Sequence, residues 1–183
     1  MSPLDASVRQ AWSSKDQSRG GPGILVADDD AEARRAVCEA LNHHGFTRVF
    51  QAADGAGCLA MYRQHADAIR VLVLDVMMPN MSGAHVLESL LQIKVQTLGV
   101  LLLSGHTDSL EAVSEKYRNA GGQLYLDTLA KPFRIPDLVN RIKRLLLSQG
   151  GPSALVGQSV LDTPAPAGSS ADGKVQSAPK SLA

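Results

Sequence analysis

The chain has 183 residues, with 18 basic and 18 acidic side chains and a formal net charge of zero at pH 7. This balance predicts neither a nucleic acid nor a membrane surface as a direct partner. The two cysteines, Cys38 and Cys58, are too few and too far apart for a disulfide scaffold or a CxxC site. No apolar run approaches the roughly 18 residues of a membrane span. We therefore expect a cytoplasmic protein.

Composition divides the chain into three parts. Residues 1–22 are polar and end in Gly-Gly-Pro, and residues 149–183 are rich in Gly, Pro, Ser and Ala. Because such segments bury too little apolar surface to offset their ordering entropy, both are predicted to be disordered tails. The remaining residues, 23–148, have the length of a typical single domain.

Within this domain, short apolar runs alternate with helical patterns. The runs predict strands at 24–27, 48–53, 71–74, 99–103 and 123–126. Predicted helices follow them: one capped by Asp30 and ended at Gly45, one around residues 58–62, then 84–94, 108–119, and a last one from about Pro136. Apolar strands between helices indicate a parallel sheet buried on both faces. We expect an α/β fold, a doubly wound open sheet with helices on both faces.

Polar side chains follow four of these strands. Asp28 and Asp29 follow the first, Asp75 the third, Ser104 the fourth and Lys131 the fifth. In open α/β sheets, ligands bind beyond the carboxyl ends of the strands. Crowded carboxylates repel one another unless they share a cation, and an all-oxygen donor set favours Mg2+. Asp75 is then a candidate nucleophile that accepts a phosphoryl group as an acyl phosphate.

Four segments resemble motifs of the receiver domain of two-component response regulators. They read ILVADDD at 24–30, LDVMMPNMSG at 74–83, LSGH at 103–106 and KPF at 131–133. The resemblance covers residues 23–148, with the motifs in the family's order. It implies a flavodoxin-like five-stranded sheet of order 2-1-3-4-5, as in chemotaxis regulators, with a cis peptide before the proline of the KPF motif. It also implies a phosphoacceptor with self-catalysed phosphoryl transfer and slow autodephosphorylation, not an enzyme in the usual sense.

The resemblance assigns a metal and an acceptor to the acidic residues. Asp75 is implied to be the phosphorylation site. Asp29 is implied to bind Mg2+ directly and Asp28 through a water molecule. Asp75 itself and the main-chain carbonyl of Met77 complete the implied set of ligands.

Further roles follow for residues around the acceptor. Ser104 and Lys131 are implied to contact the phosphoryl group, beside which Gly105 leaves room. Met77 and His106 stand where the family varies the residues that tune the lifetime of the phosphoryl group.

One position departs from the family. An aromatic switch residue usually stands three positions before the lysine, where this chain has Thr128. The segment 121–131 also looks about three residues longer than is usual in the family. Tyr125 could take the switch role if the fifth strand were shifted or bulged; otherwise the coupling between the hydroxyl and an aromatic ring is absent.

The sequence thus predicts a stand-alone receiver, because the tails leave no room for an output domain. It would accept a phosphoryl group from a sensor histidine kinase or histidine phosphotransfer protein and act on an unidentified downstream protein by contact. A phosphorylation-dependent homodimer is a further option.

Two alternatives stay open. One is a degenerate receiver that serves as a phosphorylation-independent binding scaffold. The other is an aspartate-nucleophile phosphatase, which is disfavoured because Met77 replaces the second aspartate of that class.

Overall fold

The computed structural model describes residues 18, 20–93, 97–117 and 124–149. Most of both predicted tails, the ends of the predicted helices 84–94 and 108–119, and residue 123 of the predicted fifth strand lie outside the described residues. The described elements are β1 (Gly23–Ala27), α3 (Ala31–His43), β2 (Val49–Ala52), α4 (Gly55–His65), β3 (Ile69–Asp75), α5 (Gly83–Gln92), β4 (Leu98–Ser104), α6 (Thr107–Tyr117), β5 (Leu124–Ala130) and α7 (Ile135–Ser148).

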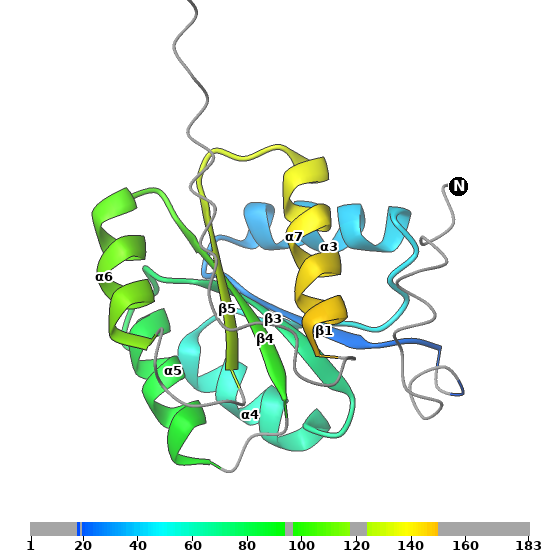
Figure 1. Cartoon of the computed structure of the whole chain (residues 1–183), viewed down its shortest axis with the longest axis horizontal. Helices are drawn as coiled ribbons and strands as arrows, with labels where there is room; N and C mark the ends of the chain where they lie inside the picture. The colour runs from blue at the N-terminus through cyan, green and yellow to red at the C-terminus, as the bar shows by residue number, and fades with distance from the viewer. Residues whose placement is uncertain (1–17, 19, 94–96, 118–123, 150–183) are drawn as a thin grey trace, which may run out of the picture.

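The strands form one parallel sheet in the order β2-β1-β3-β4-β5. Helices α3 and α7 cover one face, and α4, α5 and α6 cover the other (Figure 1). The predicted doubly wound fold and strand order are confirmed. Within the described ranges, no helix combines the length and apolar character needed to cross a membrane.

The sheet separates two apolar cores. Leu25 of β1 and Leu72 of β3 face the core under α4, α5 and α6, whereas Ile24 and Val71 face the core under α3 and α7. All four side chains are fully buried. Burying one such side chain contributes about 1.5–3 kcal/mol, so the two cores hold the central strands firmly in place.

Both ends of α3 lie where the sequence predicts them. The Asp30 carboxylate accepts the N–H groups of Glu32 and Ala33 at 2.8 and 3.1 Å and thereby caps α3. Gly45 follows the end of the same helix with φ of 87°, a left-handed conformation that glycine adopts without strain. Because Asp30 serves as the cap, its two neighbours in the acidic run are left for other contacts.

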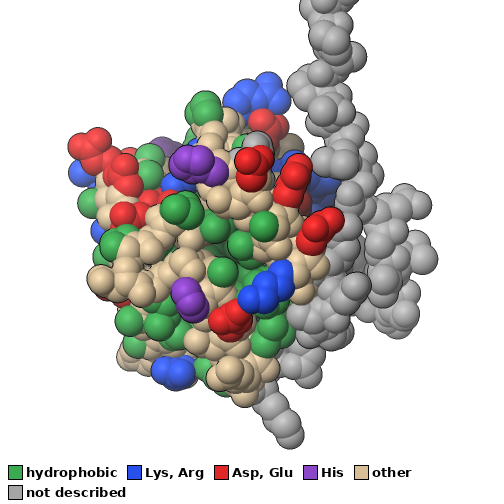
Figure 2. Space-filling model, turned by 90° about the vertical axis from the view of Figure 1, so that its left-hand side faces the viewer, with side chains coloured by type: hydrophobic (Ala, Val, Ile, Leu, Met, Phe, Trp, Pro, Cys, Tyr) green, Lys and Arg blue, Asp and Glu red, His purple; other side chains and the backbone are tan. Residues whose placement is uncertain are grey.

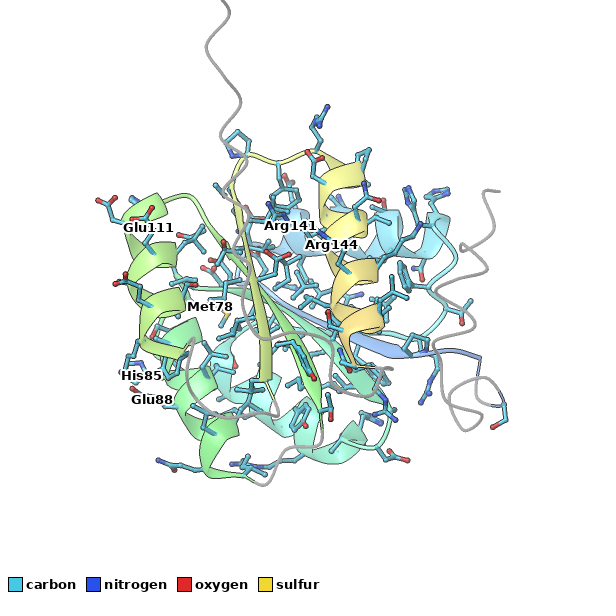
Figure 3. All side chains as sticks on the ribbon, viewed as in Figure 1. Met78, His85, Glu88, Glu111, Arg141 and Arg144 are labelled. Atoms are coloured by element: carbon cyan, nitrogen blue, oxygen red, sulfur yellow. The ribbon has the colours of Figure 1, made fainter. Side chains whose placement is uncertain are left out.

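The fifth strand is longer than predicted. It runs from Leu124 to Ala130 and pairs with β4 in an unbroken register that ends with Ser104 beside Ala130. The prediction ended at residue 126, and the polar residues Asp127 and Thr128 come next in the sequence. One of these, Asp127, is paired with Arg141 of α7, and Arg144 lies further along the same helix (Figure 3). This ion pair allows a charged residue within the strand.

A polar cluster joins α6 to α5. Lys116 forms an ion pair with Glu88, and the Tyr117 hydroxyl donates to the same carboxylate at 3.0 Å. The Tyr117 hydroxyl also lies 3.4 Å from the Ala84 carbonyl. The face that carries α5 and α6 is turned to the viewer in Figure 2. The cluster fixes the C-terminal end of α6 against its neighbour.

The last residues before β1 contact the folded domain. The Thr47 hydroxyl donates to the Gly20 carbonyl at 2.7 Å, and the Arg48 guanidinium donates to the Gly21 carbonyl at 3.2 Å. The end of the predicted N-terminal tail therefore lies against the segment that leads into β2.

Candidate functional site

The carboxyl ends of β1 and β3 bring three aspartates together. Each of Asp28, Asp29 and Asp75 offers a carboxylate oxygen, and these oxygens lie within 4.8 Å of one another. Asp28 and Asp75 are buried, with 2% and 7% of their surface exposed, whereas Asp29 is exposed. The arrangement follows from the topology, because β1 and β3 are neighbours and parallel strands end at the same side of a sheet.

Lys131 provides the positive charge of this cluster. Its Nζ lies 2.8 Å from Asp28 Oδ2 and 2.6 Å from Asp75 Oδ2. Burial disfavours the charged ammonium, but the hydrogen bonds to the two carboxylates outweigh this effect, and the pKa of Lys131 is raised above its ordinary value. The side chain therefore stays charged and bridges the ends of β1 and β3.

Main-chain groups orient the two buried carboxylates. The N–H of Met77 donates to Asp75 Oδ1 at 2.9 Å, and the N–H of Asp30 donates to Asp28 Oδ1 at 2.9 Å. Each buried aspartate thus has one oxygen held by the loop that follows it and the other held by Lys131. Such fixed donors hold the carboxylates in a defined geometry before any ligand arrives.

Ser104 lies at the end of β4, one residue beyond the partner of Asp75 in the sheet. Its side chain is fully buried, and its Oγ accepts the N–H of His106 at 3.0 Å. Its carbonyl accepts the main-chain N–H of Lys131 at 2.7 Å. The Lys131–Pro132 peptide is cis, as the resemblance implies.

The remaining predicted residues near Asp75 and Ser104 are exposed. Met77 is 57% exposed, and His106 is exposed as well. A Cβ added at Gly105 would meet no atom within 4 Å, so the space beside this residue is open.

The register of β5 places Thr128 and Tyr125 on opposite faces of the sheet. Thr128 pairs with Leu102, two residues before the pair of Ala130 with Ser104, so Thr128 shares a sheet face with Ser104. Tyr125 pairs with Gly99 and packs with the core under α3 and α7, on the opposite face. The shift or bulge that would bring Tyr125 to the switch position is not present.

The residues fit Mg2+. The three aspartates provide only hard oxygen ligands, and the exposed carboxylate of Asp29 leaves the cluster open to solvent. The main-chain carbonyl of Met77 is available in the loop after Asp75 as a further oxygen donor of the same kind.

One contact at the site escaped the sequence analysis. Arg34, on the first turn of α3, donates from Nη1 to the main-chain carbonyl of Asp28 at 2.6 Å. Its position four residues after the capping Asp30 places it on the helix turn nearest the acidic loop. The spacing from Asp30 indicates that Arg34 lies near the acidic loop, but residue types alone do not reveal a bond to a main-chain carbonyl group.

The sequence profile of the response regulator receiver domain matches residues 24–143. The chain belongs to this family. Receivers are the phosphorylatable signalling domains of two-component systems, which agrees with the motifs in the sequence and with the sheet order.

Individual relatives and structures agree with this assignment. The probable transcriptional regulatory protein TcrX of Mycobacterium tuberculosis is 35% identical over 147 residues, which cover 76% of this chain and 58% of TcrX. The response regulator MprA of Mycobacterium ulcerans is 36% identical over 125 residues, 67% of this chain and 49% of MprA. The chain thus spans about half the length of these relatives. The receiver domain of the hybrid histidine kinase CckA superposes with a TM-score of 0.54 at 28% identity, covering 67% of this chain and 97% of that domain.

Proposed function

We propose that Asp75 accepts a phosphoryl group from a phosphohistidine of a sensor histidine kinase or of a histidine phosphotransfer protein. The observation that carries this proposal is the buried Asp75 carboxylate, 2.6 Å from Lys131 Nζ and within the three-aspartate cluster. A carboxylate beside a fixed cation, at the carboxyl end of a parallel sheet, is suited to attack phosphorus.

In the proposed step, an oxygen of Asp75 attacks the phosphorus atom of the phosphoimidazole. The P–N bond breaks, and its electron pair stays on the ring nitrogen of the donor histidine as the acyl phosphate forms. The Lys131 ammonium would neutralise one phosphoryl oxygen, and the Ser104 hydroxyl would donate to another; the pairing of Lys131 with Asp75 supports the first role. Such fixed charges and donors account for most of the catalysis of phosphoryl transfer.

The proposed metal is Mg2+, which would supply further charge neutralisation for the phosphoryl oxygens when bound. Asp28, Asp29 and Asp75 would hold it, with the Met77 carbonyl as an additional ligand. The chemistry of the donor set supports this choice, because the cluster contains neither imidazole nor thiolate.

The proposed output is contact with a downstream protein, and formation of a homodimer on phosphorylation belongs to the same proposal. Thr128 rather than Tyr125 shares the face of Ser104, so a signal from the hydroxyl would pass along β5 without an aromatic ring. Whether the receiver stands alone stays a prediction, since its curated relatives are about twice as long.

The test is phosphorylation by a small phosphodonor such as acetyl phosphate. We expect one acid-labile phosphoryl group per chain by intact mass, no labelling of Asp75→Asn, and no labelling after chelation of divalent cations. Asp30→Asn is the matched control: it removes the same charge from the acidic run, and asparagine still caps α3, so labelling should persist. An acid-stable label on Asp75→Asn would overturn the assignment.

Two further measurements address the alternatives. Beryllium fluoride with Mg2+ should shift the NMR signals of residues around Asp75; no shift and no labelling would favour a phosphorylation-independent scaffold. Sustained hydrolysis of a generic phosphoester would favour the phosphatase. We expect no such turnover, because the residue two positions after Asp75 is Met77, which cannot act as a general acid.

A further inference from the structure

All three oxygen atoms of Asp28 are held by different partners. Lys131 Nζ donates to Oδ2 at 2.8 Å, the Asp30 N–H donates to Oδ1 at 2.9 Å, and Arg34 Nη1 donates to the main-chain carbonyl at 2.6 Å. The first two contacts orient the carboxylate. The third is different, because it fixes the plane of the peptide that joins Asp28 to Asp29.

The orientation of that peptide determines the direction in which the Asp29 side chain leaves the main chain. Asp29 is exposed, and among the described residues none donates a hydrogen bond to its carboxylate. Its direction therefore depends on the main chain and not on contacts of its own. If the Asp28 carbonyl turned, the adjoining peptide would turn with it, and the Asp29 carboxylate would leave its place beside Asp28 and Asp75.

The helix holds Arg34 in place for this contact. The main-chain N–H of Arg34 bonds to the carbonyl of the capping Asp30 at 2.9 Å, while its side chain reaches back over the loop to Asp28. Main chain and side chain together thus close the β1–α3 loop against the first turn of α3. The neighbouring Arg35 is exposed and instead lies 3.9 Å from Glu39 of its own helix.

We propose that Arg34 is a positioning residue of the magnesium site, which acts through the Asp28 carbonyl to set the place of the Asp29 carboxylate. This inference rests on the proposed function of the site. It assigns a role to a residue that would not itself touch the metal but would hold the main chain next to a metal ligand, as hydrogen-bond partners of ligands do in other metal sites.

The charge of Arg34 and its positioning role have opposite effects on the affinity for Mg2+. The Arg34 guanidinium is positive and lies beside the acidic cluster, so by charge alone its removal would strengthen the binding of Mg2+. Loss of an orienting contact weakens metal binding instead, commonly by about 10–100-fold. The two effects therefore predict opposite changes for a variant that loses both the charge and the donor.

The experiment measures the Kd for Mg2+ by calorimetry for the whole chain and three variants. Arg34→Met keeps a long side chain but removes the donor, and we expect binding about tenfold weaker. Arg34→Lys keeps a charged donor and should recover most of the affinity. Arg35→Met is the matched control and should bind as the unchanged chain does. In metal-free protein, the Asp30 amide should exchange its hydrogen faster in Arg34→Met alone.

The measured Mg2+ affinities and exchange rates either support or overturn the positioning role of Arg34. Tighter or unchanged binding in Arg34→Met would overturn the proposal, and so would equal losses in Arg34→Met and Arg35→Met. A loss of affinity accompanied by a loss of native circular dichroism would be assigned to unfolding, and the Asp30 exchange rate in Arg34→Lys then decides: a rate like that of the unchanged chain supports the contact, and a faster rate overturns it. If the unchanged chain binds no Mg2+, the proposed metal site itself fails.

Discussion

Gly83 provides a quantitative test of how tightly α5 packs against the strand end that carries Asp75. It is the first residue of α5, and its N–H donates to the Val76 carbonyl at 3.0 Å. A Cβ at this position would lie 2.6 Å from the Asp75 carbonyl oxygen and 2.9 Å from Val76 Cα. Ordinary van der Waals contact begins near 3.4 Å, so the first approach is short by 0.8 Å. Both neighbours are main-chain atoms, and no side-chain rotation can relieve the clash.

The expected cost of Gly83→Ala follows from two opposed effects. Overpacking of this kind destabilises proteins by about 1–3 kcal/mol. Alanine is favoured over glycine in helix interiors by up to about 1 kcal/mol, and by less at a first helical position. We therefore expect a net loss of about 1–2 kcal/mol, together with slower labelling of Asp75, because the strand end must move to make room.

The assay is urea denaturation, with acetyl phosphate labelling measured in parallel. Gly105→Ala is the control, since a Cβ there meets nothing within 4 Å and should change the free energy of unfolding by less than about 0.5 kcal/mol. If Gly83→Ala were as stable as the unchanged chain, or more stable, the close approach of α5 to the Asp75 main chain would not be the constraint described here.

Two further predictions concern the cores. Leu72→Ala removes a fully buried side chain of the central strand and should lower the free energy of unfolding in urea by about 2–5 kcal/mol; a loss below about 1 kcal/mol would contradict its place in the core. Burial raises the pKa of Cys38 to about 11 and of Cys58 to about 12, so an aromatic disulfide reagent at pH 8 should label them rapidly only in denaturant. Because the ordinary pKa is 9.0, the unfolded chain loses these protons first, and stability should fall as the pH rises above about 9. Rapid labelling of either cysteine in the native protein would contradict the burial of these two thiols.

The sequence was sufficient to predict which charged residues of the candidate site lie together, because the topology of the sheet determines their positions. Once the strands are parallel, residues at or directly after their carboxyl ends, such as Asp28, Asp75 and Lys131, must lie at one side of the sheet. The N-cap of α3 was equally predictable, since Asp30 lies within a few residues of the N–H groups that it binds.

What escaped prediction depends on partners distant in the chain or on main-chain atoms. The charged Asp127 within β5 is paired with Arg141 of α7, and no local pattern reveals that partner. The contact of Arg34 ends on a carbonyl oxygen, which every residue possesses, so residue types carry no information about it. The place of Tyr125 required the register of two strands, and a shift of one residue would have reversed its face.

The two ion pairs of Lys131 join residues that are synthesised at different times. Lys131 lies 103 residues after Asp28 and 56 residues after Asp75. On the ribosome, both carboxylates are therefore synthesised well before the ammonium group that pairs with them. Contacts so distant in the chain form only after the intervening segments have closed. The positive charge that offsets part of the acidic cluster is thus supplied by a late residue, and its pairing requires that β5 has joined the sheet.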